Sequence, residues 1–306
     1  MQIGMIGLGR MGMNMARRLL RGRHKVVAYN RTADRVKEIV KGGASGAYSL
    51  EELVTKLRPP RLTWLMLPAG KPVDEHIREL KDLLGKGDII VEGGNSYYKD
   101  DIRHEQELRA YGIHYMDVGV SGGIWGLRMG YCLMVGGDRN IYQRLEPIFK
   151  TLAPKDGYHH CGETGAGHFV KMIHNGIEYG MMAAYGEGFE VMKASPYGKN
   201  LDFAEIARLW NQGSVVRSWL LELAEAAFRK DRNLSSLSGY VEDSGEGRWT
   251  VQQAIDTAVP TPVIAASLFQ RFRSRETDAF SDKVLAALRQ EFGGHAILKA
   301  GQKKPK

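Results

Sequence analysis

The sequence predicts an α/β domain with a doubly wound sheet, followed by an all-helical domain. Three observations support this fold class. A glycine-rich turn follows the first apolar run, short apolar runs alternate with amphipathic helical patterns up to about residue 160, and strand patterns stop beyond about residue 165. We therefore expect an α/β domain over 1–165, a helical domain over 166–300 and a basic tail over 301–306.

The expected elements follow from short apolar runs, which indicate buried strands, and from apolar residues spaced about 3.6 apart, which indicate helices. In the first domain the patterns predict strands at 2–6, 25–29, 62–67, 88–92, 114–118 and 132–136, with helices at 33–42, 73–84 and 100–110. In the second they predict helices at 167–194, 201–211, 214–231, 250–257, 261–274 and 276–291.

The glycine-rich turn lies in the context that a dinucleotide needs. Gly7-Leu8-Gly9-Arg10-Met11-Gly12 follows the strand at 2–6 and opens a helical pattern. Glycines at these spacings permit a tight turn and let a pyrophosphate approach the backbone at a helix N-terminus. We therefore expect a Rossmann-type dinucleotide-binding domain.

The second strand ends in Asn30-Arg31-Thr32. An NAD site usually has a carboxylate here, which accepts hydrogen bonds from the ribose hydroxyl. Asn30 is neutral, Arg31 can pair with a 2′-phosphate, and Thr32 adds a hydroxyl. These residues favour NADP, although a surface arginine would leave NAD possible.

Later strands also end in loops suited to ligands, since ligands of doubly wound sheets bind beyond the carboxyl ends of the strands. These loops are Leu67-Pro68-Ala69-Gly70, Glu92-Gly93-Gly94-Asn95-Ser96 and Val120-Ser121-Gly122-Gly123. We expect Leu67, Pro68, Ala69 and Asn95 to contact the cofactor. Ordinary turns also favour glycine, asparagine and serine, so each loop alone is weak evidence.

The helix at 167–194 carries an unusual polar stripe. Lys171, His174, Asn175 and Glu178 are spaced i, i+3, i+4 and i+7, which places them on one face. The alternative is a solvated face with a loose lysine–glutamate pair. Because the rest of this segment is rich in apolar and small residues, we expect the stripe to face a cavity.

Composition narrows the class of protein. The chain has 306 residues, 43% of them hydrophobic, and a net charge of +8, which suits anionic ligands. Its two cysteines, Cys132 and Cys161, form neither a disulfide framework nor a CxxC metal motif. We expect a cytoplasmic enzyme without a metal or a membrane span. Scattered basic residues, not interleaved with aromatic ones, argue against a nucleic-acid partner.

Taken together, these motifs resemble the decarboxylating 6-phosphogluconate dehydrogenases, in their short form. The resemblance rests on the turn Gly7–Gly12, the segment Gly167–Tyr179 and four further motifs: Asn30-Arg31-Thr32, Gly93–Ser96, Val120–Gly123 and Gly245-Glu-Gly-Arg-Trp-Thr250. Phe292-Gly-Gly-His295 extends it to the C-terminus. Arg248 and Pro68 depart from lysines that are usual in the long form, which leaves fine contacts there open.

The resemblance implies oxidative decarboxylation of 6-phosphogluconate to ribulose 5-phosphate and CO₂ in the pentose phosphate pathway, with NADP as hydride acceptor. It assigns Lys171 as general base and Glu178 as the acid that protonates the enediol. It implies a homodimer or homotetramer in which Arg289 and His295 reach a neighbouring subunit's site. The remaining substrate-binding residues that it implies are Asn95, Ser121, Gly122, Gly123, His174, Asn175, Tyr179, Arg248, Thr250 and Arg271.

Two alternatives remain open from the sequence. The chain could act on a small unphosphorylated β-hydroxy acid, which Arg248 and Arg271 disfavour because they suit a phosphate. It could also be a non-enzymatic NADP-binding regulator or a basic nucleic-acid binder, which the stripe that includes Lys171 and Glu178 disfavours.

Overall fold

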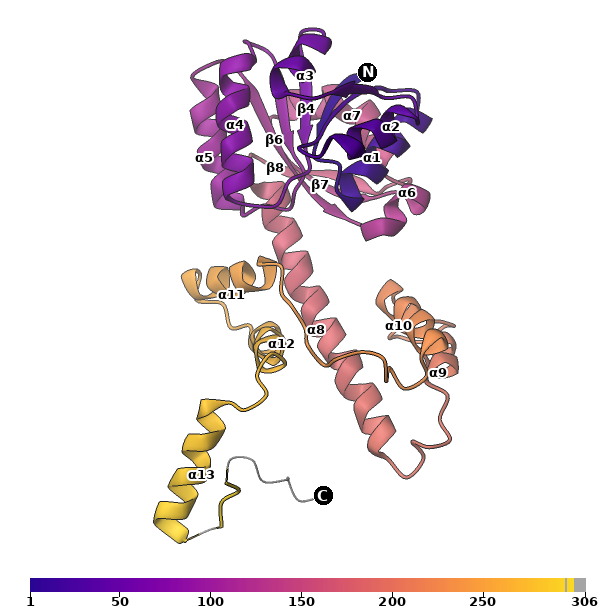
Figure 1. Ribbon diagram of the computed structural model, residues 1–306, viewed down its shortest axis with the longest axis vertical. Coiled ribbons are helices and arrows are strands. Elements are labelled where there is room, and N and C mark those ends of the chain that lie inside the picture. Colours follow the sequence, from indigo (N-terminus) through magenta and orange to yellow (C-terminus); the bar gives the residue numbers. More distant parts are fainter. Residues whose placement is uncertain (295, 300–306) are drawn as a thin grey trace. The chain divides into compact units, whose positions relative to one another are not determined.

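The computed structural model describes residues 1–294 and 296–299, which fall into two compact units, Met1–Gly176 and Ile177–Lys306. The first unit is built around one eight-stranded sheet with helices on both faces (Figure 1). Its strands are β1 (Gln2–Ile6), β2 (Lys25–Tyr29), β3 (Ser45–Ala47), β4 (Leu62–Leu65), β5 (Ile89–Glu92), β6 (His114–Ser121), β7 (Cys132–Gly137) and β8 (Tyr158–Gly162). Its helices are α1 (Arg10–Arg21), α2 (Ala33–Val40), α3 (Leu50–Lys56), α4 (Lys71–Leu83), α5 (Tyr98–Arg109), the 3₁₀ turn η1 (Gly123–Trp125), α6 (Gly126–Met129) and α7 (Arg139–Leu152).

The strand order in the sheet is β3-β2-β1-β4-β5-β6-β7-β8. Strands β1 to β6 pair in parallel, β7 runs antiparallel to β6, and β8 pairs in parallel with β7. The order reverses between β1 and β4, so the loops after these two strands diverge at the carboxyl edge of the sheet. Such a switch point is where doubly wound sheets bind their ligands.

Alternate residues of the strands enter two separate cores, because successive side chains of a strand point to opposite faces. In β1, Ile3 and Met5 pack with residues of α1, α2 and α7 on one face. Ile6 packs with residues of α3, α4 and α5 on the other. The strands of a sheet covered on both faces are expected to be apolar almost throughout, which is why they were visible in the sequence.

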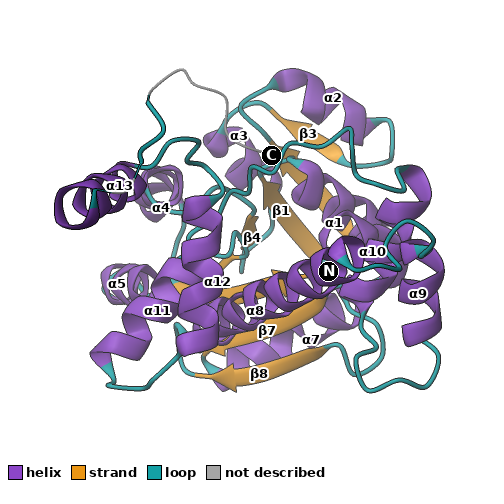
Figure 2. Cartoon of the chain, turned by 90° about the horizontal axis from the view of Figure 1, so that it is seen from below, coloured by secondary structure: helices purple, strands orange, loops and turns teal. Residues whose placement is uncertain are grey.

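The second unit contains helices and loops but no strand among its described residues (Figure 2). The long helix α8 (Ala166–Ala194) begins in the first unit and continues into the second. The other helices are α9 (Phe203–Trp210), α10 (Trp219–Lys230), α11 (Glu246–Asp256), α12 (Pro262–Arg273) and α13 (Phe280–Gly293). A small aromatic core forms where Phe189 of α8 packs against Phe203 and Phe228.

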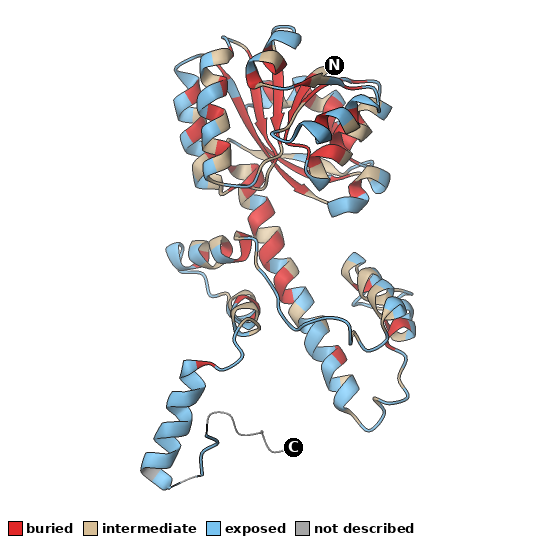
Figure 3. Cartoon of the chain, in the orientation of Figure 1, coloured by how far each residue is buried: buried red, intermediate tan, exposed pale blue. Residues whose placement is uncertain are grey.

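Helix α13 is exposed to solvent. Every residue of α13 whose burial is described is exposed, including the apolar Phe280, Val284, Leu285 and Leu288 (Figure 3). Phe280 is 79% exposed and Leu285 60%. A helix with this many exposed apolar side chains is typical of a surface that another protein covers.

The fold class predicted from the sequence is confirmed, and the differences lie in individual elements. Strands β3 and β8 are not among those expected. β3 is a three-residue edge strand of Ser, Gly and Ala, and β8 carries two histidines at the other edge, so neither shows an apolar pattern. The predicted boundary at 165/166 coincides with the start of α8 and remains a prediction of domain organisation. No helix among the described residues is long and apolar enough to cross a bilayer.

Candidate active site

In the glycine-rich turn, Gly7 and Gly12 are tightly packed, whereas Gly9 faces open space. Gly7 has a φ of +94°, and a Cβ there would lie 2.4 Å from the Met66 carbonyl oxygen. A Cβ on Gly12 would lie 2.0 Å from the Gly7 carbonyl oxygen, so α1 can pack this closely only without a side chain. Around Gly9, the N-cap of α1, a Cβ would meet nothing within 4 Å. This open backbone at a helix N-terminus fits the pyrophosphate of a dinucleotide.

The end of β2 is tied to this turn. The Asn30 carboxamide oxygen accepts a hydrogen bond from the Leu8 amide at 2.8 Å, and its nitrogen donates to the Thr32 carbonyl oxygen at 3.3 Å. Arg31 is exposed and makes no hydrogen bond or ion pair with another described residue. The structure therefore gives Asn30 a role in shaping the turn and leaves the guanidinium of Arg31 open to a ligand.

Two more loops lie at the carboxyl edge of the sheet. Leu67, Pro68 and Ala69 follow β4, where Pro68 and Ala69 are exposed. Asn95 follows β5 with a φ of +60°, which is uncommon outside glycine. Its side chain is held at both ends by Val120, donating to the carbonyl oxygen at 3.1 Å and accepting from the amide at 2.8 Å. This pair of bonds fixes the loop after β5 to the end of β6.

A chain of polar contacts joins the end of β6 to α8. Lys171 Nζ donates to the Asn175 carboxamide oxygen, which also contacts His174 Nδ1 at 2.9 Å. His174 Nε2 lies 3.5 Å from the Ser121 hydroxyl. Lys171 is only 4% exposed and Asn175 9%, whereas His174 is half-buried. The stripe expected on this helix therefore includes a buried amine that contacts its neighbours on the same face.

Glycines let α8 approach the sheet closely enough to place this amine. A Cβ on Gly119 of β6 would lie 2.3 Å from the Lys171 Cβ, and a Cβ on Gly167 would lie 2.4 Å from the Met134 carbonyl oxygen. Gly122 and Gly123, which follow Ser121, have φ values of +125° and +54°. The backbone beyond β6 thus turns through conformations that residues with a Cβ rarely adopt.

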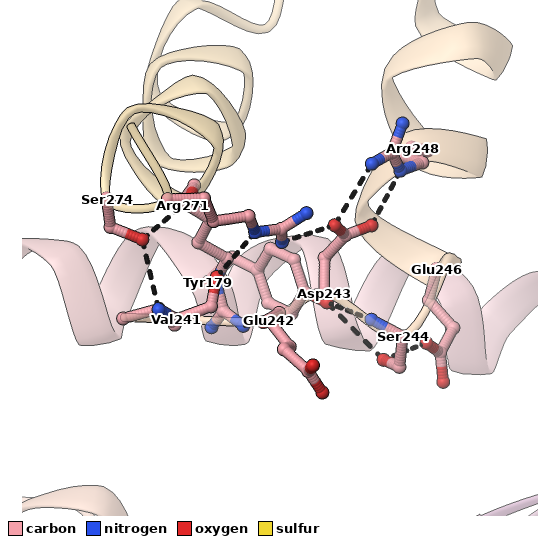
Figure 4. Close-up of polar contacts among 10 residues, drawn as sticks. Tyr179, Val241, Glu242, Asp243, Ser244, Glu246, Arg248, Arg271 and Ser274 are labelled. Carbon is pink, nitrogen blue, oxygen red and sulfur yellow. Dashed lines mark hydrogen bonds and ion pairs between the residues drawn. The ribbon is translucent and has the colours of Figure 1, made fainter. Parts of the chain in front are cut away.

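In the second unit, Tyr179 and Arg271 form a stacked pair. The guanidinium carbon of Arg271 lies 3.4 Å from the centre of the Tyr179 ring, and Arg271 donates to the Glu242 carbonyl oxygen at 2.8 Å (Figure 4). The Tyr179 hydroxyl accepts from the Ser244 amide at 3.1 Å. The segment that precedes α11 is therefore held against both residues.

Arg248 belongs to the same group of residues through Asp243 (Figure 4). Asp243 accepts from Arg248 Nε at 2.7 Å and Nη2 at 3.2 Å, and from Arg275 at 2.5 Å. Hydrogen bonding to Arg248 lowers the pKa of Asp243 to about 2, against the effect of burial. Thr250 is buried and donates to the Glu246 carbonyl oxygen. Of the four residues implied for a phosphate site, Arg248 therefore binds the Asp243 carboxylate, and Arg271 stacks on the ring of Tyr179.

Three further residues complete the predicted site. Glu178 is half-buried on α8, and Arg289 is exposed on α13. His295 lies outside the described residues. The roles assigned to these residues stay predictions.

Two family models match the chain. The NAD binding domain of 6-phosphogluconate dehydrogenase matches residues 2–162, and the 6-phosphogluconate dehydrogenase C-terminal domain matches residues 167–301. The chain belongs to the 6-phosphogluconate dehydrogenase family. It is an oxidoreductase of this family, and its first unit contains an NAD(P)-binding domain.

Full-length relatives agree with this assignment. YqeC of Bacillus subtilis, provisionally named a 6-phosphogluconate dehydrogenase, is 50% identical over 299 residues, covering 98% of this chain and 100% of YqeC. The NAD(+)-dependent, decarboxylating 6-phosphogluconate dehydrogenase of Haloferax volcanii is 43% identical over 301 residues, covering 98% of this chain and 99% of its own. The solved 6-phosphogluconate dehydrogenase of Plasmodium falciparum matches with a TM-score of 0.82 at 30% identity, covering 99% of this chain and 67% of that one; it is described apo, with its cofactor NADP+ and with its substrate 6-phosphogluconate.

Sequence reasoning missed one cluster beside the site. Glu92, Asp101, Asp117 and His168 are all 0% exposed and face one another in the first unit. Burial raises the pKa of Asp117 to about 6. The sequence did carry a signal for this cluster, because acidic residues lie inside apolar strands, as in Met116-Asp117-Val118. A carboxylate buried in this way needs a buried partner to compensate its charge.

Proposed function

We propose that this protein oxidises and decarboxylates 6-phosphogluconate to ribulose 5-phosphate and CO₂. The observation that carries the proposal is the buried amine of Lys171, which contacts Asn175 on the face of α8 that also carries His174. Family membership supplies the class of reaction, and these residues supply groups suited to it.

Lys171 is the proposed general base and acid. The substrate is a β-hydroxy acid, and oxidation at C3 requires the hydroxyl proton to leave while a hydride leaves the carbon. Lys171 takes the proton, which requires a neutral amine, and burial disfavours the charged form. NADP, when bound, accepts the hydride. The resulting β-keto acid loses CO₂ from C1 as Lys171 returns its proton to the C3 oxygen, leaving an enediol.

Glu178 is the proposed acid for the last step. It donates a proton to C1 of the enediol while Lys171 takes back the proton of the adjacent hydroxyl, which gives ribulose 5-phosphate. Because a protonated lysine stabilises negative charge on the C3 oxygen, the decarboxylation needs no metal ion. Asn95, Ser121, His174 and Asn175 would hold the carboxylate and hydroxyl groups, with the backbone of Gly122 and Gly123.

Tyr179, Arg248, Thr250 and Arg271 are the proposed phosphate site. An arginine fork matches phosphate oxygens, and Arg248 already binds a carboxylate through two nitrogens. Its side chain is 54% exposed, so it remains accessible to a second anion. An unphosphorylated substrate would make no use of these arginines.

We propose NADP as the cofactor, with NAD as the alternative. Gly7–Gly12, Asn30, Arg31, Thr32 and the loop Leu67–Ala69 would hold it, with Asn95 at the neighbouring strand end. The open guanidinium of Arg31 supports NADP, since a 2′-phosphate would give it a charged partner. The Haloferax volcanii relative is named as NAD(+)-dependent, which supports the alternative.

We also propose that the protein is a homo-oligomer with shared active sites. The exposed apolar face of α13 needs a partner, and a second copy of the chain would supply one. Arg289 on α13, together with His295, would then reach the neighbouring subunit's substrate.

The test combines two readouts. Protein, NADP and 6-phosphogluconate are mixed, and absorbance at 340 nm and CO₂ release are followed together. We expect both to rise in equal molar amounts. A panel of small unphosphorylated β-hydroxy acids serves as control, and faster turnover of any of these would contradict the proposal. The same assay with NAD ranks the cofactors.

A further inference from the structure

A buried histidine links two parts of the first unit that carry the proposed chemistry. His168 lies in the first turn of α8 and is 0% exposed. Its Nδ1 lies 2.7 Å from Asp101 of α5, and its Nε2 lies 3.6 Å from Glu92 at the end of β5. Asp101 also accepts a hydrogen bond from the Tyr115 hydroxyl at 2.8 Å. None of these side chains has a part in the proposed reaction.

The cluster contains one imidazole and three carboxyl groups, so its charges must be considered together. One imidazole faces the carboxyl groups of Asp101, Glu92 and Asp117, and the Tyr115 hydroxyl is hydrogen-bonded beside them. Burial alone lowers the pKa of His168, but Asp101, followed by Glu92 and Asp117, raises it to about 10. Burial raises the pKa of Glu92 against the attraction of the imidazolium. The imidazolium is therefore charged at neutral pH, and it compensates carboxylates that would otherwise be buried without a cation.

From Glu92 the contacts lead to the loop that carries Asn95. The second oxygen of Glu92 accepts from the Gly94 amide at 2.7 Å. A Cβ on Gly94 would lie 2.2 Å from the Leu67 carbonyl oxygen, so the loop is closely confined there. The next residue, Asn95, has its positive φ and its two bonds to Val120. Glu92 and Val120 thus fix this loop from its two sides.

From Asp117 the contacts lead to the helix that carries Lys171. Asp117 accepts from the amides of Gly165 and His168 at 2.7 and 2.8 Å, which caps the N-terminus of α8 with a carboxylate. Lys171 lies one turn further along α8, where its Cβ rests against Gly119. Asp117, which the imidazole of His168 faces, therefore fixes the turn of α8 that precedes Lys171.

We propose that His168 is a positioning residue that, through Glu92 and Asp117, holds the loop of Asn95 and the start of α8 in the arrangement needed for one substrate to contact both Asn95 and Lys171. The inference rests on the proposed function. Its physical basis is that displacements of about 1 Å in a positioning group can cost on the order of a hundredfold in rate.

The test compares His168→Gln with a matched control. Glutamine keeps hydrogen-bonding groups but removes the charge. His104→Gln removes another buried histidine, which lies in α5, is 2% exposed and bonds to Asp74 instead of the carboxylates of the cluster, although its ring lies 6.0 Å from that of Tyr115. We expect His168→Gln to raise the KM for 6-phosphogluconate about tenfold and to lower kcat severalfold, with the Kd for NADP unchanged. We expect His104→Gln to leave all three constants within about twofold of wild type.

Two further measurements separate positioning from stability. Adding Asp101→Asn to His168→Gln neutralises the carboxylate that lies 2.7 Å from the imidazole in the wild type, so the double variant should recover part of the lost kcat/KM. Hydrogen exchange of peptides spanning 93–96 and 165–172 should quicken in His168→Gln without substrate. This readout holds even if wild type fails to turn over 6-phosphogluconate, which would refute the proposed function alone.

Several results would overturn the inference. These are an unchanged KM in folded His168→Gln, equal effects of His168→Gln and His104→Gln, or unchanged exchange in both peptides. Stoichiometric metal in the wild-type protein that is lost in His168→Gln would also overturn it, because Glu92, Asp101 and His168 present ligand atoms within 4.8 Å of one another. If His168→Gln does not fold, Glu92→Gln is measured by the same criteria.

Discussion

The two units differ in how completely they bury their apolar residues. The first unit has a core on each face of its sheet, and its glycine turn and two strand-end loops join those cores through Leu8, Val120 and Leu67. The second unit has one small aromatic core, and α13 exposes Phe280, Leu285 and Leu288. The difference supports the proposal that a second copy of the chain covers the exposed helix of the second unit, whereas the first unit has two cores of its own.

The largest expected effect distinguishes the two proposed catalytic residues, Lys171 of the first unit and Glu178 of the second. Lys171→Ala removes the proton acceptor of the first step, so turnover should fall by about a thousandfold or more while substrate and cofactor still bind. Glu178→Gln should spare hydride transfer and slow release of ribulose 5-phosphate. Single-turnover absorbance at 340 nm and product analysis separate the two steps. Lys81→Ala, a change on the surface of α4, is the control, and near wild-type activity of Lys171→Ala would refute the assignment.

The next prediction tests whether Arg289 and His295 act at the substrate site of another copy of the chain. An inactive Lys171→Ala chain is mixed with an inactive Arg289→Ala/His295→Ala chain under conditions that exchange subunits. Random mixing of dimers in which sites are shared would restore up to about a quarter of wild-type activity, since half the dimers are hybrid and each has one intact site. Light scattering and native mass spectrometry verify the oligomer and the exchange. A mixture that exchanges but stays inactive would show that the tail does not act across an interface.

A smaller effect is expected at the cofactor site of the first unit. Arg31→Ala should lower kcat/KM for NADP by about 10- to 100-fold, because a charge-assisted hydrogen bond is worth roughly 1.5–3 kcal/mol. The value for NAD should change little. Arg35→Ala removes a nearby guanidinium that is already paired with Glu38, so it controls for general charge. A wild-type protein that prefers NAD would contradict the choice of cofactor.

The smallest effect is a pH dependence of stability in the first unit. The pKa of His168 is raised from 6.5 to about 10 in the folded chain, so its protonation stabilises the fold fully below pH 6.5 and progressively less towards pH 10. Between pH 7 and 9.5, the free energy of unfolding of wild type should therefore fall by more than that of His168→Gln. Urea unfolding at several pH values measures this, and parallel curves for the two proteins would contradict the charged imidazole.

The sequence predicted most of the first unit because its strands are apolar throughout and its glycines follow a spaced motif. Edge strands β3 and β8 lacked that pattern, since one is built of small residues and the other is only partly buried. The helices α9 to α13 were located approximately, but the ion pairs between them could not be inferred. Asp243, which binds both Arg248 and Arg275, comes from a loop without a periodic pattern.

In the candidate site, too, the sequence predicted contacts within one helix but not contacts between distant segments. The stripe on α8 identified Lys171 and Asn175 because helical spacing is regular, and their contact follows from it. The sequence could not show that Asn30 binds the glycine turn or that Asn95 is held by Val120, because both contacts join distant segments. His168 was hidden for the same reason, since its partners come from three other elements of the sheet and helices.

The placement of His168 also bears on how genes of this family can recombine. A crossover between codons 162 and 167, where the two family models adjoin, takes the imidazole from one parent and the facing carboxylates of Glu92, Asp101 and Asp117 from the other. Chimaeras of parents that differ at any of these positions would inherit an unbalanced buried charge. Gene shuffling should therefore yield viable hybrids more often when the junction lies beyond Asn175, so that the histidine and its three acids descend together.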